Sequence, residues 1–313
     1  MGKILKKQGF AFDVSGLSDY TDQVTNLELL VAMQYGTETA ALTSKQTGIK
    51  SSSDLHTMDN TVYLQSGTNC GVNPSGGTAL DNRTITTYPI KVQNSWCIRD
   101  LEAKWTQILL SKGQNYTEAD LPNAILDDIK KQVSKLLEIA DWSGDTTSWN
   151  TNLNQYDGLR KIIKATSGVV AATTSTYNET NCRTILRNIV YNIPAALKGS
   201  NEVIVFCGYP EFETYRNKLA IDNLYHFDGK SSGYEMMIEN SNIKLKAVHG
   251  LDNTAELYAL VPTNAYLGCD MENEQEEVKL WYSMDDDKVY SSIRFRRGWQ
   301  IGVPSEIVYY KNT

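Results

Sequence analysis

DLPNAILDDIKKQVSKLLEIADWSG, residues 120–144, does most to decide the fold of this 313-residue chain. Asp120 can cap a helix, and Pro122 fits the first helical turn. Apolar residues then recur at helical spacing until Gly144 ends the pattern, and the opposite face is charged. The apolar face consists of Ile125, Ile129, Val133, Leu136, Leu137 and Ala140. The sequence therefore predicts a long amphipathic helix over about 120–141 that lies on a sheet.

Downstream of this helix the sequence predicts an α/β layer. VIVFC, residues 203–207, is a continuous apolar run bounded by turn residues, which is typical of a fully buried strand. Helices are predicted on both sides of it, over about 179–197 and 210–219. The C-terminal third is mostly strands, predicted over 243–248, 256–261, 277–283, 289–295, 299–303 and 307–310.

Upstream of the long helix the composition changes. Ser, Thr, Gly and Asn dominate from Thr43 to about Leu80, and such residues form turns but bury little surface. Two strand-like pieces with period-two alternation, 61–64 and 84–92, are separated by a flexible tip. They predict a long protruding hairpin over 45–94, and a helix is expected to follow over 95–110. A two-stranded hairpin is only marginally stable in water, so this one needs a neighbour.

The composition bounds the class of protein. The chain is 41% hydrophobic and 21% charged, as in ordinary globular proteins. It has no apolar run near the ~20 residues that span a bilayer and no signal-like N-terminus, so we expect no membrane association and folding in a cytoplasm. The net charge of −7 disfavours tight binding of nucleic acid, which needs clustered Lys and Arg. The protein can enclose DNA without gripping it.

No catalytic or metal motif appears in the sequence. The five cysteines form no C-x-x-C pair, and the three histidines lie on different predicted elements. There is no G-x-S-x-G elbow, no phosphate-binding glycine loop and no dinucleotide fingerprint. We therefore expect no catalytic residues, no cofactor and no enzyme activity.

One local feature is distinctive, an acidic tip on the hairpin predicted over 277–297. It consists of Asp285, Asp286 and Asp287. Such a run is commonly a solvated turn, because Asp favours turns. It is alternatively a point where several copies meet, and then a cation or the nearby Arg294, Arg296 and Arg297 must relieve the repulsion.

The order of these segments resembles the major capsid proteins of tailed bacteriophages, which share the Hong Kong ninety-seven capsid fold with bacterial encapsulins. In that family an N-terminal arm precedes an extended hairpin loop and a long spine helix. Later phrases also resemble the family, namely YDGL (156–159), VIVFCGYPEFETYRNKL (203–219), AYLGCD (265–270) and GWQIGVPSEIV (298–308). The resemblance spans nearly the whole chain and depends on the order of the segments rather than on one invariant signature.

The resemblance implies an α+β phage capsid fold with four parts. They are an N-terminal arm over 1–44, the extended hairpin loop over 45–94, a peripheral domain with the spine helix and a β-hairpin over 95–164 and 276–298, and a central axial α/β domain over 165–275 and 299–313. The arm and the hairpin are then expected to lie across an adjacent subunit, which buries the surface that their own chain leaves exposed.

The resemblance also implies a function, that of a major capsid protein. Copies are expected to assemble into hexamers and pentamers of an icosahedral head shell that encloses DNA, built in the host bacterial cytoplasm. Expected partners are a separate scaffolding protein, a portal and decoration proteins. Expected contacts between subunits are Lys45, Lys50, Val62, Tyr63, Leu64, Ile85, Tyr88, Ile90, Asp285, Asp286, Asp287, Arg294, Arg296 and Arg297.

Three other interpretations stay open at this point. An encapsulin-type nanocompartment shell shares the fold but holds protein cargo. An α/β enzyme with an appended hairpin predicts a monomer or small oligomer with a concave pocket. Another virion component, such as a tail-tube or decoration protein, is usually rich in β-structure, and the helix predicted over 120–141 counts against it.

Overall fold

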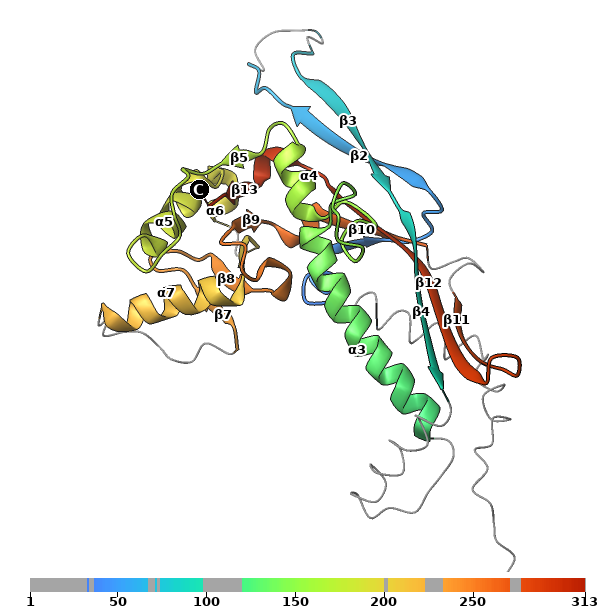
Figure 1. The fold of residues 1–313 in the computed structure, drawn as a ribbon. Helices are drawn as coiled ribbons and strands as arrows, with labels where there is room; N and C mark the ends of the chain where they lie inside the picture. The colour runs from blue at the N-terminus through green and yellow to red at the C-terminus, as the bar shows by residue number, and fades with distance from the viewer. Residues whose placement is uncertain are drawn as a thin grey trace, which may run out of the picture. The chain divides into compact units, whose positions relative to one another are not determined.

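The computed structural model describes residues 33, 37–66, 71, 74–97, 120–199, 202–222, 233–270 and 277–312 (Figure 1). The chain forms two compact units, which are described separately. Unit 1 comprises Met1–Tyr35, Ile90–Ser134 and Glu274–Phe295, and unit 2 comprises Gly36–Pro89, Lys135–Asn273 and Arg296–Thr313. Most of the predicted arm therefore lies outside the described residues.

Unit 1 contains a strand hairpin and the first part of the long helix. Strands β11 (Glu277–Ser283) and β12 (Lys288–Ile301) pair antiparallel, with Ser283 opposite Lys288 across the turn. Strand β4 (Tyr88–Cys97) also pairs with β12. Helix α3 covers Asp120–Ser143, which confirms the helix predicted over about 120–141. Both α3 and β12 continue along the chain into unit 2.

Unit 2 is built on a six-stranded sheet in the order β5-β13-β9-β6-β8-β7. Strand β6 pairs parallel with β8 and antiparallel with β9, so the apolar run at 203–207 is an interior strand of the sheet, as predicted. The strands are β5 (Val170–Ala171), β6 (Ile204–Cys207), β7 (Glu235–Met237), β8 (Lys244–Ala247), β9 (Leu257–Leu260) and β13 (Val308–Tyr310).

Two helices cover this sheet with apolar side chains. Helix α5 (Cys182–Asn192) contributes Ile185 and Ile189, and α7 (Tyr209–Ile221) contributes Phe212, to one buried cluster with the strands. The α/β layer predicted from residues 179–219 is therefore present (Figure 1).

The helix predicted over 179–197 is wrong in its length. It is divided into α5 and a short α6 (Ala195–Lys198), with Ile193 in an extended conformation between them. Pro194 explains the interruption, because a proline disfavours the helical conformation of the residue before it and has no N–H to donate.

The remaining elements of unit 2 are short strands and short helices. Strand β1 (Ser44–Gln46) pairs parallel with β10 (Ala265–Cys269), and β10 pairs antiparallel with the end of β12. Helix α4 (Leu159–Ala165) follows α3 after a loop. Short 3-10 helices occur at His249–Leu251, Pro262–Asn264 and Pro304–Glu306.

The predicted hairpin exists, but its strands are displaced along the sequence. Strand β2 covers Ser52–Thr61 and β3 covers Gly77–Thr86, paired from Ser52↔Thr86 to Thr61↔Gly77. Of the run at 61–64, only Thr61 belongs to β2, and residues 62–64 lie beyond the end of that strand. The predicted strand over 84–92 is divided at Thr87 between β3 and β4, because β3 pairs with β2 whereas β4 pairs with β12.

Two further predictions change. The helix expected over 95–110 does not begin at Ser95, since 95–97 belong to β4; residues 98–110 lie outside the described residues. The separate strands expected over 289–295 and 299–303 form one strand, β12, of 14 residues.

Candidate functional site: the extended hairpin

The base of the hairpin is anchored in unit 2 by a small apolar cluster. Ile49, Leu55 and Ile85 are buried together, with Tyr266 of β10 packed against them. Leu55 and Ile85 belong to β2 and β3, where alternate residues share one face of a strand. Ile85 has no exposed surface in its own chain, and its predicted contact with another subunit stays a prediction.

Close backbone approach fixes where the hairpin leaves the sheet. A Cβ added to Gly298 of β12 would lie 2.0 Å from the carbonyl oxygen of Thr86, and only glycine allows that contact. Thr87 then donates its N–H to the Ser51 carbonyl (2.8 Å) and its hydroxyl to the Ile49 carbonyl (3.0 Å). The base is thus held by backbone geometry as well as by apolar packing.

Long side chains of β12 complete this attachment. Gln300 donates from Nε2 to the Thr84 carbonyl at 2.8 Å, and Arg296 donates from Nη1 to the Lys50 carbonyl. Arg296, which was predicted to contact another subunit, is half-buried, and part of its guanidinium group is bound to its own chain.

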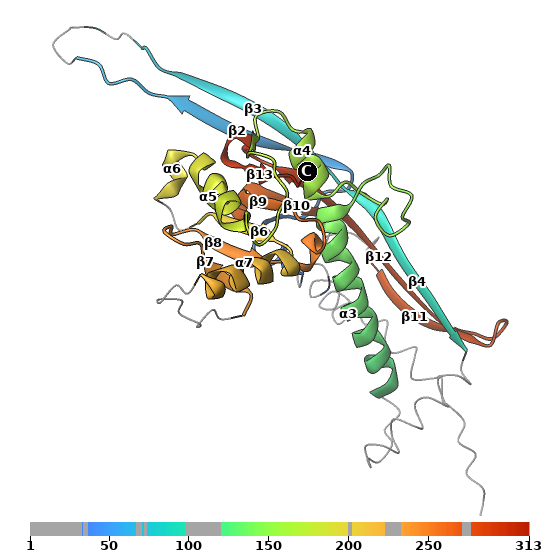
Figure 2. The ribbon, with the colours of Figure 1, turned by 60° about the vertical axis from the view of Figure 1, so that its left-hand side comes forward.

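Beyond this base the hairpin is largely exposed within the described residues of its own unit. Along β3 every side chain from Gly77 to Asn82 is exposed, so both faces of the ribbon meet solvent. Figures 1 and 2 show β2 and β3 running away from the six-stranded sheet of the same unit. Ten residues of strand span roughly 33 Å, so the ribbon reaches far from its anchor.

Cross-strand pairs hold the two strands of the ribbon together. Asp54 accepts from the Thr84 hydroxyl (2.8 Å), and Asn60 accepts from the Thr78 hydroxyl (2.7 Å). Between these pairs, the His56 ring and the Asn82 side chain lie 2.6 Å apart. Such pairs each contribute only about 0.2–1 kcal/mol, which leaves the register defined but the ribbon weakly stabilised.

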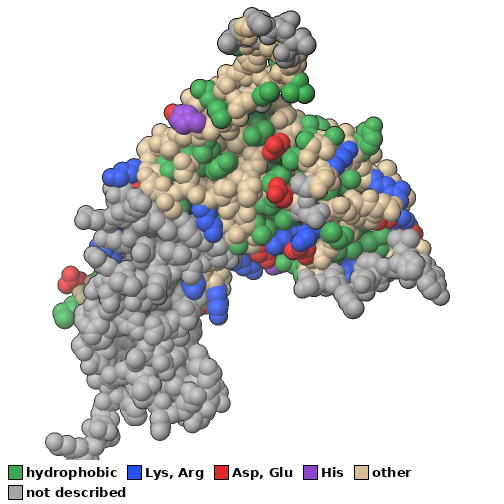
Figure 3. Space-filling view, turned by 180° about the vertical axis from the view of Figure 1, so that it is seen from behind, with side chains coloured by type: hydrophobic (Ala, Val, Ile, Leu, Met, Phe, Trp, Pro, Cys, Tyr) green, Lys and Arg blue, Asp and Glu red, His purple; other side chains and the backbone are tan. Residues whose placement is uncertain are grey.

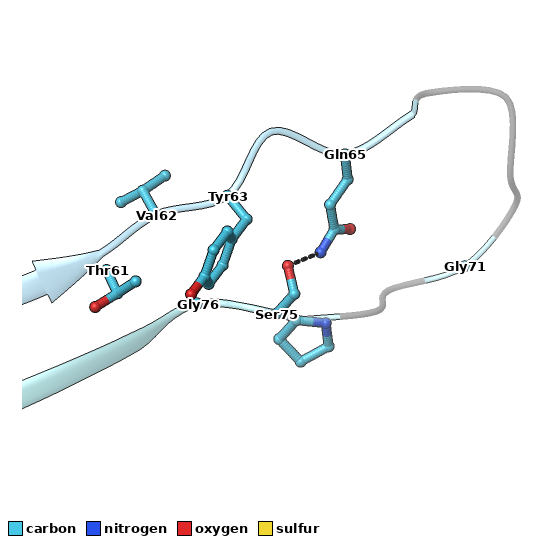
Figure 4. A pocket seen from close by; sticks show the side chains of 8 residues that line it. Thr61, Val62, Tyr63, Gln65, Gly71, Ser75 and Gly76 are labelled. Carbon is cyan, nitrogen blue, oxygen red and sulfur yellow. Dashed lines mark hydrogen bonds between the residues drawn. The ribbon is translucent and has the colours of Figure 1, made fainter.

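The tip of the hairpin combines exposed apolar side chains with a lack of charge. Val62, Tyr63 and Leu64 are 80%, 61% and 102% exposed. Gln65 and Ser75 hydrogen-bond across the tip, beside a shallow hollow (Figure 4). Residues 60–80 include no charged residue. Figure 3 shows hydrophobic side chains in green on the part that projects at the top of the view.

A buried ionic cluster lies where α3, β12 and the chain after α3 meet in unit 2. Arg297 of β12 donates from Nε to Oδ1 of Asp141 (2.7 Å) and from Nη2 to Oδ2. Tyr156 and Trp299 also donate to Oδ1, each at 2.7 Å. Arg297 and Asp141 are fully buried in their own unit, and the predicted contact of Arg297 with another subunit stays a prediction. Three side chains thus converge on the buried Asp141 carboxylate, which gives the cluster a structural role.

A second buried carboxylate, Glu138, ties residues 37–43 to α3. Thr39 donates its N–H to Oε2 of Glu138 (3.0 Å) and its hydroxyl to Oε1 (2.5 Å), and Trp142 donates to the same hydroxyl oxygen (2.7 Å). Burial, with Asp141 nearby, raises the pKa of Glu138 to about 7. The described end of the predicted arm is thus packed into its own unit.

The acidic tip lies in the turn between β11 and β12, as predicted. Asp285, Asp286 and Asp287 are exposed there. Tyr290 donates its hydroxyl to Asp286 and Tyr282 donates to Asp287, each at 2.8 Å, and these hydrogen bonds raise the pKa of both tyrosines. Within the described residues no group of three or more His, Cys, Asp or Glu side chains is arranged to hold a metal ion.

The other predicted contact residues differ in exposure. Lys45, Lys50 and Arg294 are exposed, Tyr88 is 37% exposed and Ile90 is half-buried. Their roles between subunits remain predictions.

None of the described helices is long and apolar enough to cross a membrane.

The cysteines of the described residues are buried or half-buried. Cys182, Cys207 and Cys269 are buried and Cys97 is half-buried, and burial raises the pKa of the Cys207 thiol. A raised pKa suppresses the nucleophilic thiolate of Cys207, which packs as a small apolar side chain.

The sequence interpretation missed two features of unit 2. The alternation Val289, Ser291, Ile293, Phe295 along β12 continues to Arg297, so the burial of Arg297 could have been predicted by extending the period by two. The second feature is Trp149, whose side chain is 102% exposed in the loop between α3 and α4. No sequence signal indicates its exposure, because Trp is usually largely covered.

Comparison with known proteins identifies the fold. No protein-family model matches the chain, and no curated protein sequence matches it. A chain of the satellite phage P4 procapsid that includes the size determination (Sid) protein is similar in structure, with a TM-score of 0.65 at 12% identity, covering 91% of this chain and 90% of that chain. Similar chains come from Microbacterium phage Oxtober96 (0.57, 12% identity, 88% and 91%) and from the capsid of an empty GTA particle (0.54, 12% identity, 87% and 88%).

These similarities extend over nearly the whole chain rather than over one motif. The chain therefore has a mixed α+β fold, and it is the fold of phage capsid proteins, as the order of its segments predicted.

Proposed function

We propose that this chain is the major capsid protein of a tailed bacteriophage, whose copies form the hexamers and pentamers of a head shell around DNA. The observation that carries the proposal is the hairpin whose distal part is exposed on both faces, in a chain with a phage capsid fold. The fold similarity supports a shell protein, and the hairpin supports assembly with other copies.

The physical argument concerns the cover that the hairpin needs. An isolated two-stranded hairpin is marginally stable, and exposed strands invite pairing with other chains. If the cover comes from another copy, each subunit both gives and receives a hairpin, which is a heterologous contact that closes into rings. Many weak contacts of this kind then sum to a stable shell.

The charge of the chain supports enclosure of DNA rather than binding to it. A net charge of −7 repels phosphate, so the wall is expected to confine DNA without reading its sequence. We further propose a separate scaffolding protein, a portal and decoration proteins as partners, with assembly in the host bacterial cytoplasm and the finished protein in the virion capsid.

We also propose a role for each part of the fold. The six-stranded sheet with α5 and α7 suits the axial domain over 165–275 and 299–313, because it is a compact body with its own core. The long helix α3 and the β11–β12 hairpin suit the peripheral domain over 95–164 and 276–298, with the acidic tip at a contact between capsomers.

The test is assembly of the purified full chain. Sedimentation and negative-stain microscopy are expected to reveal shells, sheets or hexameric rings. A monodisperse species at the single-chain mass of 35.1 kDa at every concentration and salt condition would contradict the proposal. Closed particles obtained from infected cells are expected to contain DNA, and protein cargo in its place would instead identify an encapsulin-type shell.

A further inference from the structure

The loop between α3 and α4 presents a single large aromatic side chain to solvent. This loop, residues 145–157, carries Trp149 at 102% exposure. An exposed Trp is a costly feature to retain, because its large apolar surface is left in water. Such residues are typical anchors of protein interfaces, where Trp is enriched and charged residues are depleted.

The base of the loop is rigidly attached to the end of α3. Gly158 donates its N–H to the Gly144 carbonyl at 2.9 Å, and an added Cβ on Gly144 would lie 2.6 Å from the Tyr156 carbonyl oxygen. Tyr156 is buried and donates to Asp141 of α3. The two ends of the loop are therefore fixed by close packing and by the buried ionic cluster.

Hydrogen bonds within the loop fix the segment that carries Trp149. Asp145 donates its N–H to the Leu153 carbonyl (2.8 Å) and accepts from the Thr147 N–H (2.8 Å), and the Asn150 N–H donates to the Ser148 hydroxyl (3.2 Å). A surface held in this way loses little conformational entropy on binding. The exposed indole is thus presented by a preorganised loop.

The middle of the loop carries no charge. Residues 146–156 include no charged residue, in a chain that is 21% charged. The flanking Asp145 and Asp157 both accept from Lys161, at 2.8 and 2.7 Å, which neutralises part of their charge. The hydrogen bond from Lys161 holds the pKa of Asp145 well below its usual range. The loop therefore suits an occupant that is itself uncharged and partly apolar.

The tip of the hairpin has the matching character. Residues 60–80 are also free of charge, and they expose Val62, Tyr63 and Leu64. A second uncharged apolar surface is the most favourable cover for such a tip. Contact between two uncharged surfaces removes no charged group from water, so no desolvation penalty for a charge arises. We infer that Trp149 anchors the hairpin tip of a second copy of this chain on the 145–157 loop. This inference rests on the proposed self-assembly and names its receiving surface.

The test is crosslinking between two differently labelled copies, in a background where Cys70 and Cys97 are Ser. One copy carries Leu64→Cys, and the other carries Thr151→Cys, which is exposed on the loop and leaves Trp149 intact. The control replaces Thr151→Cys by Asn217→Cys, an equally exposed position on α7. The copies are mixed, assembled and treated with a short bismaleimide, and each linked pair is quantified in the sedimented assemblies.

We expect the 64–151 pair to be linked at least tenfold more than the 64–217 pair. Trp149→Ala in the receiving copy is expected to reduce that link at least fivefold, and Trp149→Phe to retain most of it, with no change in the thermal midpoint of the unassembled chain. Assemblies in which the 64–151 link does not exceed the control would overturn the inference and leave the proposed function standing. Failure of the parent chain to assemble at all would overturn both.

Discussion

The six-stranded sheet and the β2–β3 hairpin of unit 2 place similar strands in opposite surroundings. Every side chain of β9 is buried, whereas β3 buries only Ile85 of its ten side chains. The sheet is covered by apolar helices, while the hairpin keeps its register through cross-strand polar pairs. Pairing between β2 and β3 is thus enough to set the register of the hairpin. Its stability requires another surface that covers the exposed strands.

The largest expected effect comes from removing the uncovered part of the hairpin. Replacing residues 58–80 by Asn-Gly joins the paired Thr57 and Asp81 through a two-residue turn and keeps Leu55 and Ile85 in place. Soluble folded protein with an unchanged thermal midpoint is expected, together with at least a tenfold loss of closed particles by negative-stain microscopy.

A length-matched control sharpens this result. Replacing Val62, Tyr63 and Leu64 by Ser keeps the ribbon but removes its exposed apolar surface, and an intermediate loss of particles is expected. Normal particles from the shortened chain would refute the account of the hairpin.

Within the folded unit the largest effect is expected at the buried ionic cluster. Arg297→Met leaves the Asp141 carboxylate buried without its cation, which costs about 3–5 kcal/mol of unfolding free energy. Arg294→Met, an exposed position of the same strand, is the matched control and is expected to stay within about 0.5 kcal/mol. Denaturant titration of both variants measures the difference, and equal values would contradict the structural role of Arg297.

A truncation pair compares the two regions directly. Leu245→Ala in β8 of the sheet is expected to cost about 2–5 kcal/mol, because it leaves a cavity in the buried cluster. Leu64→Ala at the hairpin tip is expected to change the stability of the unassembled chain by less than about 0.5 kcal/mol. In assembled particles Leu64→Ala is expected to lower the thermal stability of the particle. Calorimetry of the unassembled chain and of the particles measures this difference.

The smallest expected effect is a dependence on pH at Glu138. Its pKa is about 7 in the folded chain and 4.5 in the unfolded chain, so the folded state retains a proton between these values. The free energy of unfolding therefore falls as the pH rises from about 4.5 through 7, by on the order of 2–3 kcal/mol. Glu138→Gln is expected to remove this slope in urea titrations, and an unchanged slope would assign it to another group.

Much of the fold follows from local sequence patterns. The helical spacing over 120–141 predicted α3, and the apolar run at 203–207 predicted β6, because each pattern depends only on neighbouring residues. Pro194 is a local signal of the same kind for the break between α5 and α6, and the prediction of one helix over 179–197 missed it. Where the signal lies in adjacent residues, the sequence is sufficient.

The other differences between prediction and structure have another origin, namely contacts with residues that lie far away in the sequence. The β-branched and aromatic residues at 61–64 favour a strand by propensity, yet pairing of β2 with β3 ends at Thr61. Arg297 looked like a surface residue because its partner Asp141 is 156 positions away. Trp149 is exposed because no other described part of its own chain packs over it. Neighbouring residues in the sequence give no signal for that.

Hydrogen exchange of the hairpin amides, compared between unassembled chains and closed particles, measures whether another copy covers the hairpin. We expect the distal amides of β2 and β3 to exchange at least tenfold more slowly in particles, a gain of about 1.4 kcal/mol or more in protection. The amides of β6 and β8 are expected to be equally protected in both states. Distal hairpin amides that are already as protected in the lone chain as those of β6 would contradict the claim that another copy supplies their cover.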